Sequence, residues 1–134
     1  LAFELDSDLL DALNGLAKST AYEHQIDCRF ESKGSITLPR DVANHLYWIA
    51  REAVVNSIKH SIATKITICL DQCADRLQLS VKDNGLGVSE SNSGSTGIGM
   101  KVMQQRAQLT GGSLTVGSNS PHGTVVCCEI PMNY

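Results

Sequence analysis

The sequence predicts an α+β two-layer sandwich, in which a mixed, mainly antiparallel sheet carries about three helices on one face. Three observations favour this class. Segments of helical periodicity alternate with segments of period two, two of the strand-like segments are separated only by a short turn, and the three helices cannot all be βαβ crossovers. We find no internal repeat and no second domain, so residues 1–134 are expected to form a single domain.

Two helices and one strand are expected in the first part of the chain. Residues 7–24 carry leucines at helical spacing after a Ser or Asp N-cap candidate, and residues 26–32 alternate apolar and polar side chains like a half-buried strand. Residues 40–60 are the most periodic segment, and they follow Pro39, whose fixed φ suits a first helical turn. The apolar stripe of this helix comprises Val42, Leu46, Ile49 and Ala53.

Four strands and one further helix are expected in the rest of the chain. The strands are predicted at residues 64–70, 76–83, 113–118 and 123–131. Because only a short turn separates the first two, they should form an antiparallel hairpin. A glycine-rich stretch follows this hairpin and leads into an amphipathic helix at residues 99–112, which closes on a pair of glycines.

Composition and charge exclude several classes of protein. The chain is 42% hydrophobic and 19% charged, as expected for a soluble globular domain, and no apolar run approaches the ~20 residues that a bilayer span needs. A net charge of -3 without a basic cluster argues against nucleic acid as a partner. Scattered cysteines and histidines favour reduced core thiols and disfavour zinc, so any metal should be bound through oxygen ligands. The chain opens at Leu1 without Met or a signal pattern, and we expect it to be part of a longer protein.

An acid and an amide lie at the margin of the apolar face of the helix predicted at 40–60. Glu52 and Asn56 are four residues apart and are therefore neighbours on the helix surface. They lie beside the apolar stripe rather than opposite it, a position that faces a pocket more readily than open water. Lys59 and His60 continue this side one turn later. A solvated helix edge with a Glu–Lys pair is the alternative that this helix alone leaves open.

A second cluster begins where the hairpin ends. Asp83 closes a predicted strand and is followed at once by Asn-Gly-Leu-Gly, in which Gly85 and Gly87 let the backbone turn sharply and approach a ligand. A carboxylate placed there can accept a hydrogen bond from an amine. The alternative is a plain Asn-Gly turn, but no partner strand follows. The chain instead continues through a Ser-rich segment, residues 89–96, which we expect to act as a mobile lid.

A second pair of glycines, Gly97 and Gly99, lies at the start of the last predicted helix. Backbone amides at a helix N-terminus suit phosphate oxygens, although neither the P-loop nor the dinucleotide-binding fingerprint is present. Each of these three clusters offers a different kind of binding group. Asp83 offers an acceptor for a base amine, Asn56 an oxygen ligand for Mg²⁺, and the glycines a nest for phosphates. Together these are the parts of a nucleoside triphosphate site.

The same motifs resemble those of the Bergerat-fold (GHKL) ATPases, which include sensor histidine kinases, gyrase-type topoisomerases, heat-shock chaperones and mismatch-repair ATPases. REAVVNSIKHS is similar to the N box, DNGLGV to the first glycine box and GSTGIGM to the second. The short lid and the segment GIGMKVMQQRAQLTGGSLTVGS further resemble the catalytic ATP-binding domain of nitrate/nitrite-sensor-type histidine kinases. The resemblance covers roughly residues 5–131.

The resemblance implies a role for each matching residue. Asn56 would coordinate Mg²⁺, Asp83 would bind the adenine amine, and Thr124 would support the adenine end beside Asp83. The implied catalytic residues are the N-box positions Glu52, Lys59 and His60. The other implied nucleotide-binding residues are the glycine-box positions Gly85, Gly87, Gly97, Ile98, Gly99 and Met100.

The resemblance also implies cofactors, partners and a location. With ATP and Mg²⁺ as cofactors, the domain would pass the γ-phosphoryl group to a His on a dimerisation domain of the same chain, and from there to a response regulator. No histidine here has the context of a phosphoacceptor, so this fragment, expected to be monomeric, would bind ATP without phosphorylating itself. Its parent would be a homodimer, with this domain in the cytoplasm and the sensor in the inner membrane.

Two other readings stay open. The first is a stand-alone GHKL-type ATPase or an anti-sigma-factor serine kinase of the same fold. The second is a degenerate interaction module that keeps the fold without nucleotide. The intact Asn56, Asp83 and glycine pairs disfavour the second reading.

Overall fold

The computed structural model of the protein describes residues 2–87 and 98–132, with α1 described at the level of side chains from Asp8 onward. Within these residues the elements follow the predicted order of helices and strands. They are α1 (Ala2–His24), β1 (Asp27–Lys33), α2 (Arg40–Lys59), β2 (Lys65–Gln72), β3 (Arg76–Asp83), α3 (Ile98–Leu109), β4 (Ser113–Ser118) and β5 (Thr124–Pro131).

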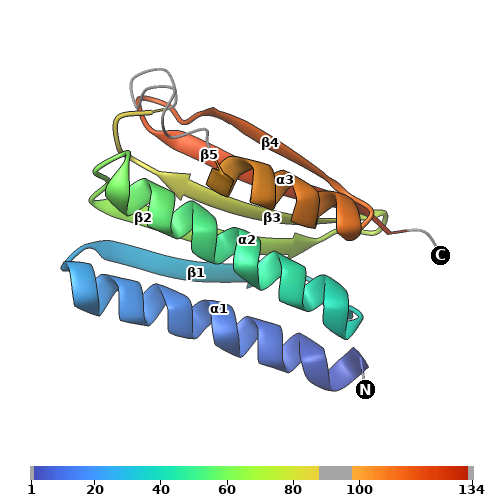
Figure 1. The fold of residues 1–134 in the computed structure, drawn as a ribbon. Helices are drawn as coiled ribbons and strands as arrows, with labels where there is room; N and C mark the ends of the chain where they lie inside the picture. Colours follow the sequence, from blue (N-terminus) through green and yellow to red (C-terminus); the bar gives the residue numbers. More distant parts are fainter. Residues whose placement is uncertain (1, 88–97, 133–134) are drawn as a thin grey trace.

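The strands form one sheet in the order β1-β2-β3-β5-β4. The pair β1–β2 is parallel and the other three pairs are antiparallel, so the prediction of a mixed, mainly antiparallel sheet is confirmed. The predicted hairpin is also confirmed, with Leu70 of β2 opposite Leu79 of β3. All three helices lie on one face of this sheet, as Figure 1 shows, which makes the fold a two-layer sandwich.

The core lies between the helical layer and the inner face of the sheet. Alternate side chains of the central strands are buried there, because successive residues of a strand point to opposite faces. The inward set comprises Ile66, Ile68, Leu70, Leu77, Leu79, Val81, Val126, Cys128 and Ile130. β1 lies at the edge of the sheet, where only Cys28 of its predicted apolar set is buried, while Ile26 and Phe30 are half-buried.

The start of α1 differs from the prediction. The helix begins at Ala2 rather than at the Ser7 or Asp8 cap, so these residues lie within the first turns. Ala, Leu and Glu before Ser7 are good helix formers, and they extend the helix through the polar pair.

All five cysteines are free thiols. Burial raises the pKa of Cys28, and likewise that of Cys128, from the ordinary value of 9.0 to about 11, and the neighbouring Asp27 adds to the shift of Cys28. Both thiols therefore stay protonated at neutral pH and pack as small apolar groups.

The helices α2 and α3 pack against each other in opposite directions. Glu52, late in α2, lies against Gly99 at the start of α3. His45, early in α2, contacts Arg106 near the end of α3. This arrangement brings the N-terminus of α3 to the half of α2 that carries Glu52 and Asn56.

Candidate functional site

Asp83 ends β3 with its carboxylate buried and hydrogen-bonded on both oxygens. Only 3% of the residue is exposed. Its Oδ1 accepts hydrogen bonds from the backbone N–H of Gly85 at 2.9 Å and of Thr124 at 3.1 Å, and its Oδ2 accepts one from the Ser57 hydroxyl at 2.6 Å. An ionised carboxylate offers about four acceptor positions, so these three bonds leave one for a ligand donor. The three bonds fix the plane of the carboxylate.

The first glycine motif is pressed against the end of α2. A Cβ at Gly85 would collide with the Ser61 carbonyl, and it would lie 2.6 Å from the Ser61 Cβ. The Leu86 N–H donates to that same carbonyl at 2.8 Å. Only glycine allows the chain to pass this close to the end of α2. The sequence predicts a close approach to a ligand at Gly85, and that stays a prediction.

Asn84 has a structural role. Its side-chain oxygen accepts hydrogen bonds from the backbone N–H groups of Thr64 and Lys65 at the start of β2, and its amide donates to the Thr64 hydroxyl. Because the side chain is engaged with β2, Asn84 anchors the loop rather than offering itself to a ligand.

The β4–β5 connection holds the loop from the other side. The Asn119 amide donates to the Asp83 carbonyl at 2.9 Å. His122 Nδ1 lies 3.2 Å from the Gly85 carbonyl, and because a carbonyl only accepts, the proton must be on Nδ1. Gly123, at φ 121°, packs so closely on the Asp83 carbonyl that a Cβ would collide with it. The Gly87 position, at φ 95°, lies beside this same Gly123.

The α2 helix connects this end of the site to the second glycine motif. Ser57 contacts Asp83, whereas a Cβ at Gly99 would collide with the Glu52 carboxylate. Ser57 lies five positions after Glu52, a rise of about 7.5 Å along the helix. Asn56 is half-buried on α2 and lies between these two positions in helical angle. The sequence-predicted Asp83, Asn56, Glu52 and Gly99 are thus brought to one side of α2.

The other residues predicted for the site make fewer contacts with the Asp83 network or with Glu52. Lys59 and His60 are exposed at the end of α2, and within the described part of the chain neither side chain makes a hydrogen bond or ion pair. Ile98 is 81% exposed at the start of α3, and Met100 is half-buried against the core. Thr124 is buried and contributes its backbone N–H to Asp83. Gly97 and the lid at 89–96 lie outside the described residues.

Sequence reasoning missed three residues that hold the site together. Ser57 reads as one more small residue of a buried helix face, although a hydroxyl in such a stripe signals a buried hydrogen-bond partner. Asn119 and His122 read as ordinary turn residues. Nothing in their local pattern indicates contact with a loop more than thirty positions earlier.

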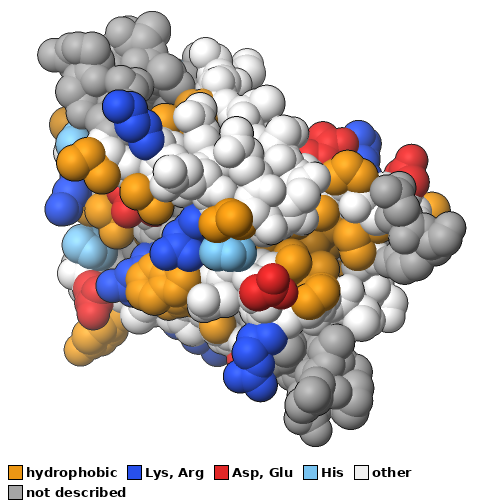
Figure 2. All heavy atoms as spheres, turned by 45° about the vertical axis from the view of Figure 1, so that its right-hand side comes forward, with side chains coloured by type: hydrophobic (Ala, Val, Ile, Leu, Met, Phe, Trp, Pro, Cys, Tyr) orange, Lys and Arg blue, Asp and Glu red, His pale blue; other side chains and the backbone are white. Residues whose placement is uncertain are grey.

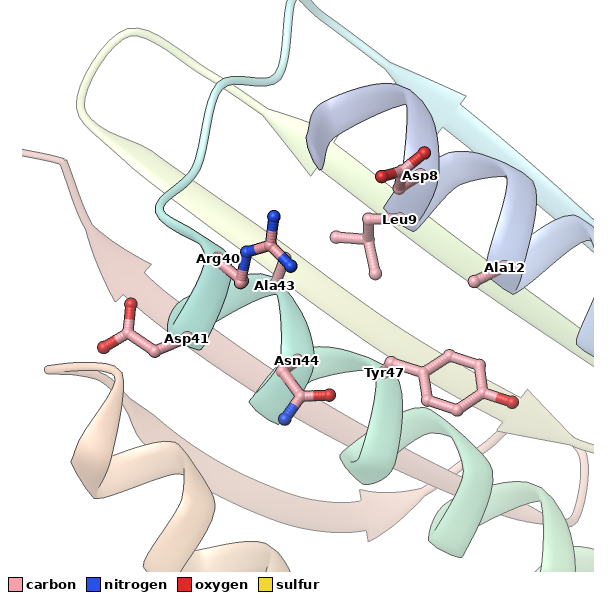
Figure 3. Close-up of a pocket in the computed structure, with 8 residues that line it drawn as sticks. All are labelled: Asp8, Leu9, Ala12, Arg40, Asp41, Ala43, Asn44 and Tyr47. Carbon is pink, nitrogen blue, oxygen red and sulfur yellow. The ribbon is translucent and has the colours of Figure 1, made fainter. Parts of the chain in front are cut away.

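A cavity among the described residues lies away from these side chains. A groove of about 810 Å³ separates the first halves of α1 and α2, and Figure 3 shows its lining side chains. They are Asp8, Leu9, Ala12, Arg40, Asp41, Ala43, Asn44 and Tyr47. None is a predicted site residue, and none contacts the Asp83 network. Converging polar groups, which this groove does not share with the Asp83 network, identify the candidate site.

Two features are absent from the residues that the structure describes. Across residues 2–87 and 98–132, no group of three His, Cys, Asp or Glu side chains is arranged to hold a metal ion. None of the helices in that part of the chain is both long and apolar enough for a membrane span.

The chain matches one protein family and several curated proteins, and these matches agree with one another. Residues 41–134 match the family described as "Histidine kinase-, DNA gyrase B-, and HSP90-like ATPase". The nitrate/nitrite sensor protein NarQ of Escherichia coli is 32% identical over 124 residues, which are 92% of this chain and 21% of NarQ. NarX of the same organism is 40% identical over 95 residues, 70% of this chain and 16% of NarX. This chain therefore spans about a fifth or less of the length of these relatives.

The fold has close counterparts among solved structures. The ATP-binding domain of PrrB from Mycobacterium tuberculosis superimposes with a TM-score of 0.72 at 22% identity, covering 93% of this chain and 94% of that domain. At this level of identity the match supports the fold, which is the predicted α+β sandwich.

Proposed function

The chain belongs to the family of histidine kinase-, DNA gyrase B- and HSP90-like ATPases, and we propose that it is the ATP-binding catalytic domain of a two-component sensor histidine kinase. The observation that carries the proposal is the buried Asp83 carboxylate, which is held by three donors and has acceptor capacity left over. A donor such as the exocyclic amine of adenine suits that position.

The adenine end is the Asp83 network. The adenine amine would donate to Asp83 Oδ2, beside the Ser57 hydroxyl, since Oδ1 already accepts two N–H groups. Gly85 and Gly87 would let the loop follow the base, and the backbone of Thr124 would keep the carboxylate oriented. A base without this amine would leave a buried acceptor unpaired, which is the physical basis of selectivity.

The phosphate end is the N-terminus of α3. Gly97, Ile98, Gly99 and Met100 would place backbone N–H groups around the phosphates, where the helix dipole favours negative charge. Asn56 would hold Mg²⁺ through its amide oxygen, with phosphate oxygens and water completing the shell. A cation also suits this end because the Glu52 carboxylate already lies against Gly99 and would otherwise repel a polyphosphate.

In the transfer itself the protein mainly positions groups and neutralises charge. Glu52 would orient or activate the attacking group, and Lys59 and His60 would lie toward the phosphates from the end of α2. The acceptor would be a His on the dimerisation domain of the same, longer chain, and a response regulator would receive the phosphoryl group next. The parent would be a homodimer that holds this domain in the cytoplasm.

Isothermal titration of Mg-ATP and Mg-ITP into the protein tests the adenine assignment. ITP presents a carbonyl in place of the amine, so the wild-type protein should bind it more weakly than ATP. Asp83→Asn should lower ATP affinity about 10- to 100-fold, because hydrogen bonds to a charged group contribute about 1.5–3 kcal/mol. It should also remove the preference for ATP.

Asp75→Asn, an exposed substitution in the β2–β3 turn, is the matched control and should change neither affinity. Equal binding of ATP and ITP by the wild-type protein, or full ATP affinity in Asp83→Asn, would refute the assignment.

A further inference from the structure

Trp48 forms an exposed cation–π cluster on α2. It is the one tryptophan of the chain and is 41% exposed. Arg51 lies over its ring with 5.5 Å between the guanidinium carbon and the ring centroid, and Arg106 of α3 does so at 5.9 Å. Tyr47 packs edge-on at 5.4 Å between ring centroids. These contacts hold two guanidinium groups beside one aromatic surface.

Neither arginine of this cluster forms an ion pair with an acidic side chain that the structure describes. In the described part of the chain, the ion pairs are Arg29–Asp27 and Arg76–Glu129. Arg106 instead donates to His45 Nδ1 at 3.1 Å, so that nitrogen accepts and carries no proton. Packing on Trp48 and the bond to His45 thus position the two guanidinium groups, and no carboxylate of the described residues pairs with either.

Apolar side chains extend the cluster along α3. Seven large hydrophobic side chains are exposed among the described residues, and four of them belong to α2 and α3. Val102 and Leu109 lie within one turn of Arg106 and on the same side of α3. This helix has two basic residues and no acidic one, in a chain of net charge -3. Figure 2 shows basic and histidine side chains bordering hydrophobic ones on the face that it presents.

We propose that Trp48, Arg51, Val102, Arg106 and Leu109, here called the Trp48 surface, bind an amphipathic helix of a partner protein that carries carboxylates beside an apolar stripe. A stacked guanidinium keeps its N–H edge free for a bidentate bond to a carboxylate. Exposed Trp and Arg side chains are those that most often dominate binding interfaces. None of these five residues is proposed to bind nucleotide, so this surface is independent of the proposed function.

The fluorescence of Trp48 gives a direct test, because the chain holds no other tryptophan. The probe is a synthetic, tryptophan-free helical peptide with glutamates four residues apart beside a leucine stripe. The comparison peptide is identical except that lysines replace the glutamates. Titration of the Glu peptide should change Trp48 emission saturably, and more weakly in high salt. The Lys peptide should give no saturable change.

Substitutions then test whether the Glu peptide binds at the Trp48 surface or at another part of the protein. Arg51→Gln and Arg106→Gln should each weaken binding of the Glu peptide about five- to tenfold, as expected for one interfacial ion pair. Arg76→Gln, at an exposed arginine of β3, should bind like wild type. Circular dichroism checks that Arg106→Gln stays folded. Arg51→Gln tests the same binding surface while leaving the bond between Arg106 and His45 intact. Mg-ATP affinity should be unchanged in both variants.

Three results would overturn the proposal. One is equal binding of the Lys and Glu peptides, and another is wild-type affinity in both arginine variants. The third is a dimer in sedimentation that Arg51→Gln dissociates, because a second copy of the chain would then be the occupant of this surface.

Discussion

The two ends of the candidate site differ in how far they are assembled. At the proposed adenine end, Asp83 is buried and receives hydrogen bonds from α2, from its own loop and from β5. At the phosphate end, an acidic side chain, Glu52, lies against a helix N-terminus. The first end is preorganised for one donor. The second holds a charge of the same sign as the ligand that we propose for it.

This difference suggests that one end selects the base and that the other governs how the charge of the phosphates is neutralised. A rigid, hydrogen-bonded acceptor selects a base at little reorganisation cost, because its partners are already ordered. At the proposed phosphate end, a polyphosphate would need a cation, or a movement of Glu52, to bind closely. We therefore expect base selectivity to depend on the adenine end and metal dependence on the phosphate end.

The largest effect should come from disrupting the adenine end through its backbone. Gly123→Ala places a Cβ onto the Asp83 carbonyl at a residue with φ 121°. Strain of this kind, added to the clash, should lower the free energy of unfolding by about 2–4 kcal/mol. Urea denaturation followed by circular dichroism measures it.

Gly117→Ala in β4 is the control, since nothing lies within 4 Å of its added Cβ. It should change stability by no more than about 0.5 kcal/mol. Equal effects in the two variants would mean that the loop yields and that the adenine end is not rigid.

A smaller and more selective effect is expected at Asn56. Asn56→Ala removes the proposed oxygen ligand, so Mg-ATP affinity should fall about tenfold while affinity for metal-free ATP changes little. Asn44→Ala alters an exposed asparagine of the same helix and should leave both affinities unchanged. If the dependence on Mg²⁺ persists in Asn56→Ala, Asn56 is a helix-edge residue and the metal assignment is wrong.

The smallest effect should be a gain in affinity for metal-free ATP when Glu52 is replaced. Glu52→Gln removes the negative charge beside the α3 N-terminus, so metal-free ATP should bind about three- to tenfold more tightly. The gain should shrink when Mg²⁺ is present, because the cation already screens the repulsion. Glu23→Gln on α1 serves as the control in the same titration. Weaker binding of metal-free ATP by Glu52→Gln would contradict this. It would show that the Glu52 carboxylate accepts a hydrogen bond from the ligand and that this bond outweighs the repulsion.

Much of this protein could be predicted from local sequence. The order of helices and strands and the β2–β3 hairpin follow from periodicity and turn residues. Asp83 was recognisable as a carboxylate at a strand end followed by glycines, and Glu52 with Asn56 as polar residues at the margin of an apolar stripe. The α1 boundary was wrong because a polar cap candidate inside good helix formers does not stop a helix.

Contacts between distant segments could not be predicted in this way. Ser57 shares the buried face of α2 and gives no periodic signal of its bond to Asp83. Asn119 and His122 read as turn residues, yet they fasten the loop of the first glycine motif. The cluster of Trp48 and Arg106 exists only because α3 packs along α2.

The sequence by itself determined which elements form and which residue types could bind a nucleotide, because periodicity, turn residues and functional groups are local properties of the chain. Only the tertiary structure decided that Asp83 is buried with three donors and that Glu52 lies on Gly99. The physical reason is that burial and hydrogen-bond partners depend on how helices and strands pack. That packing is a compromise among all the side chains of the core rather than a property of any one segment.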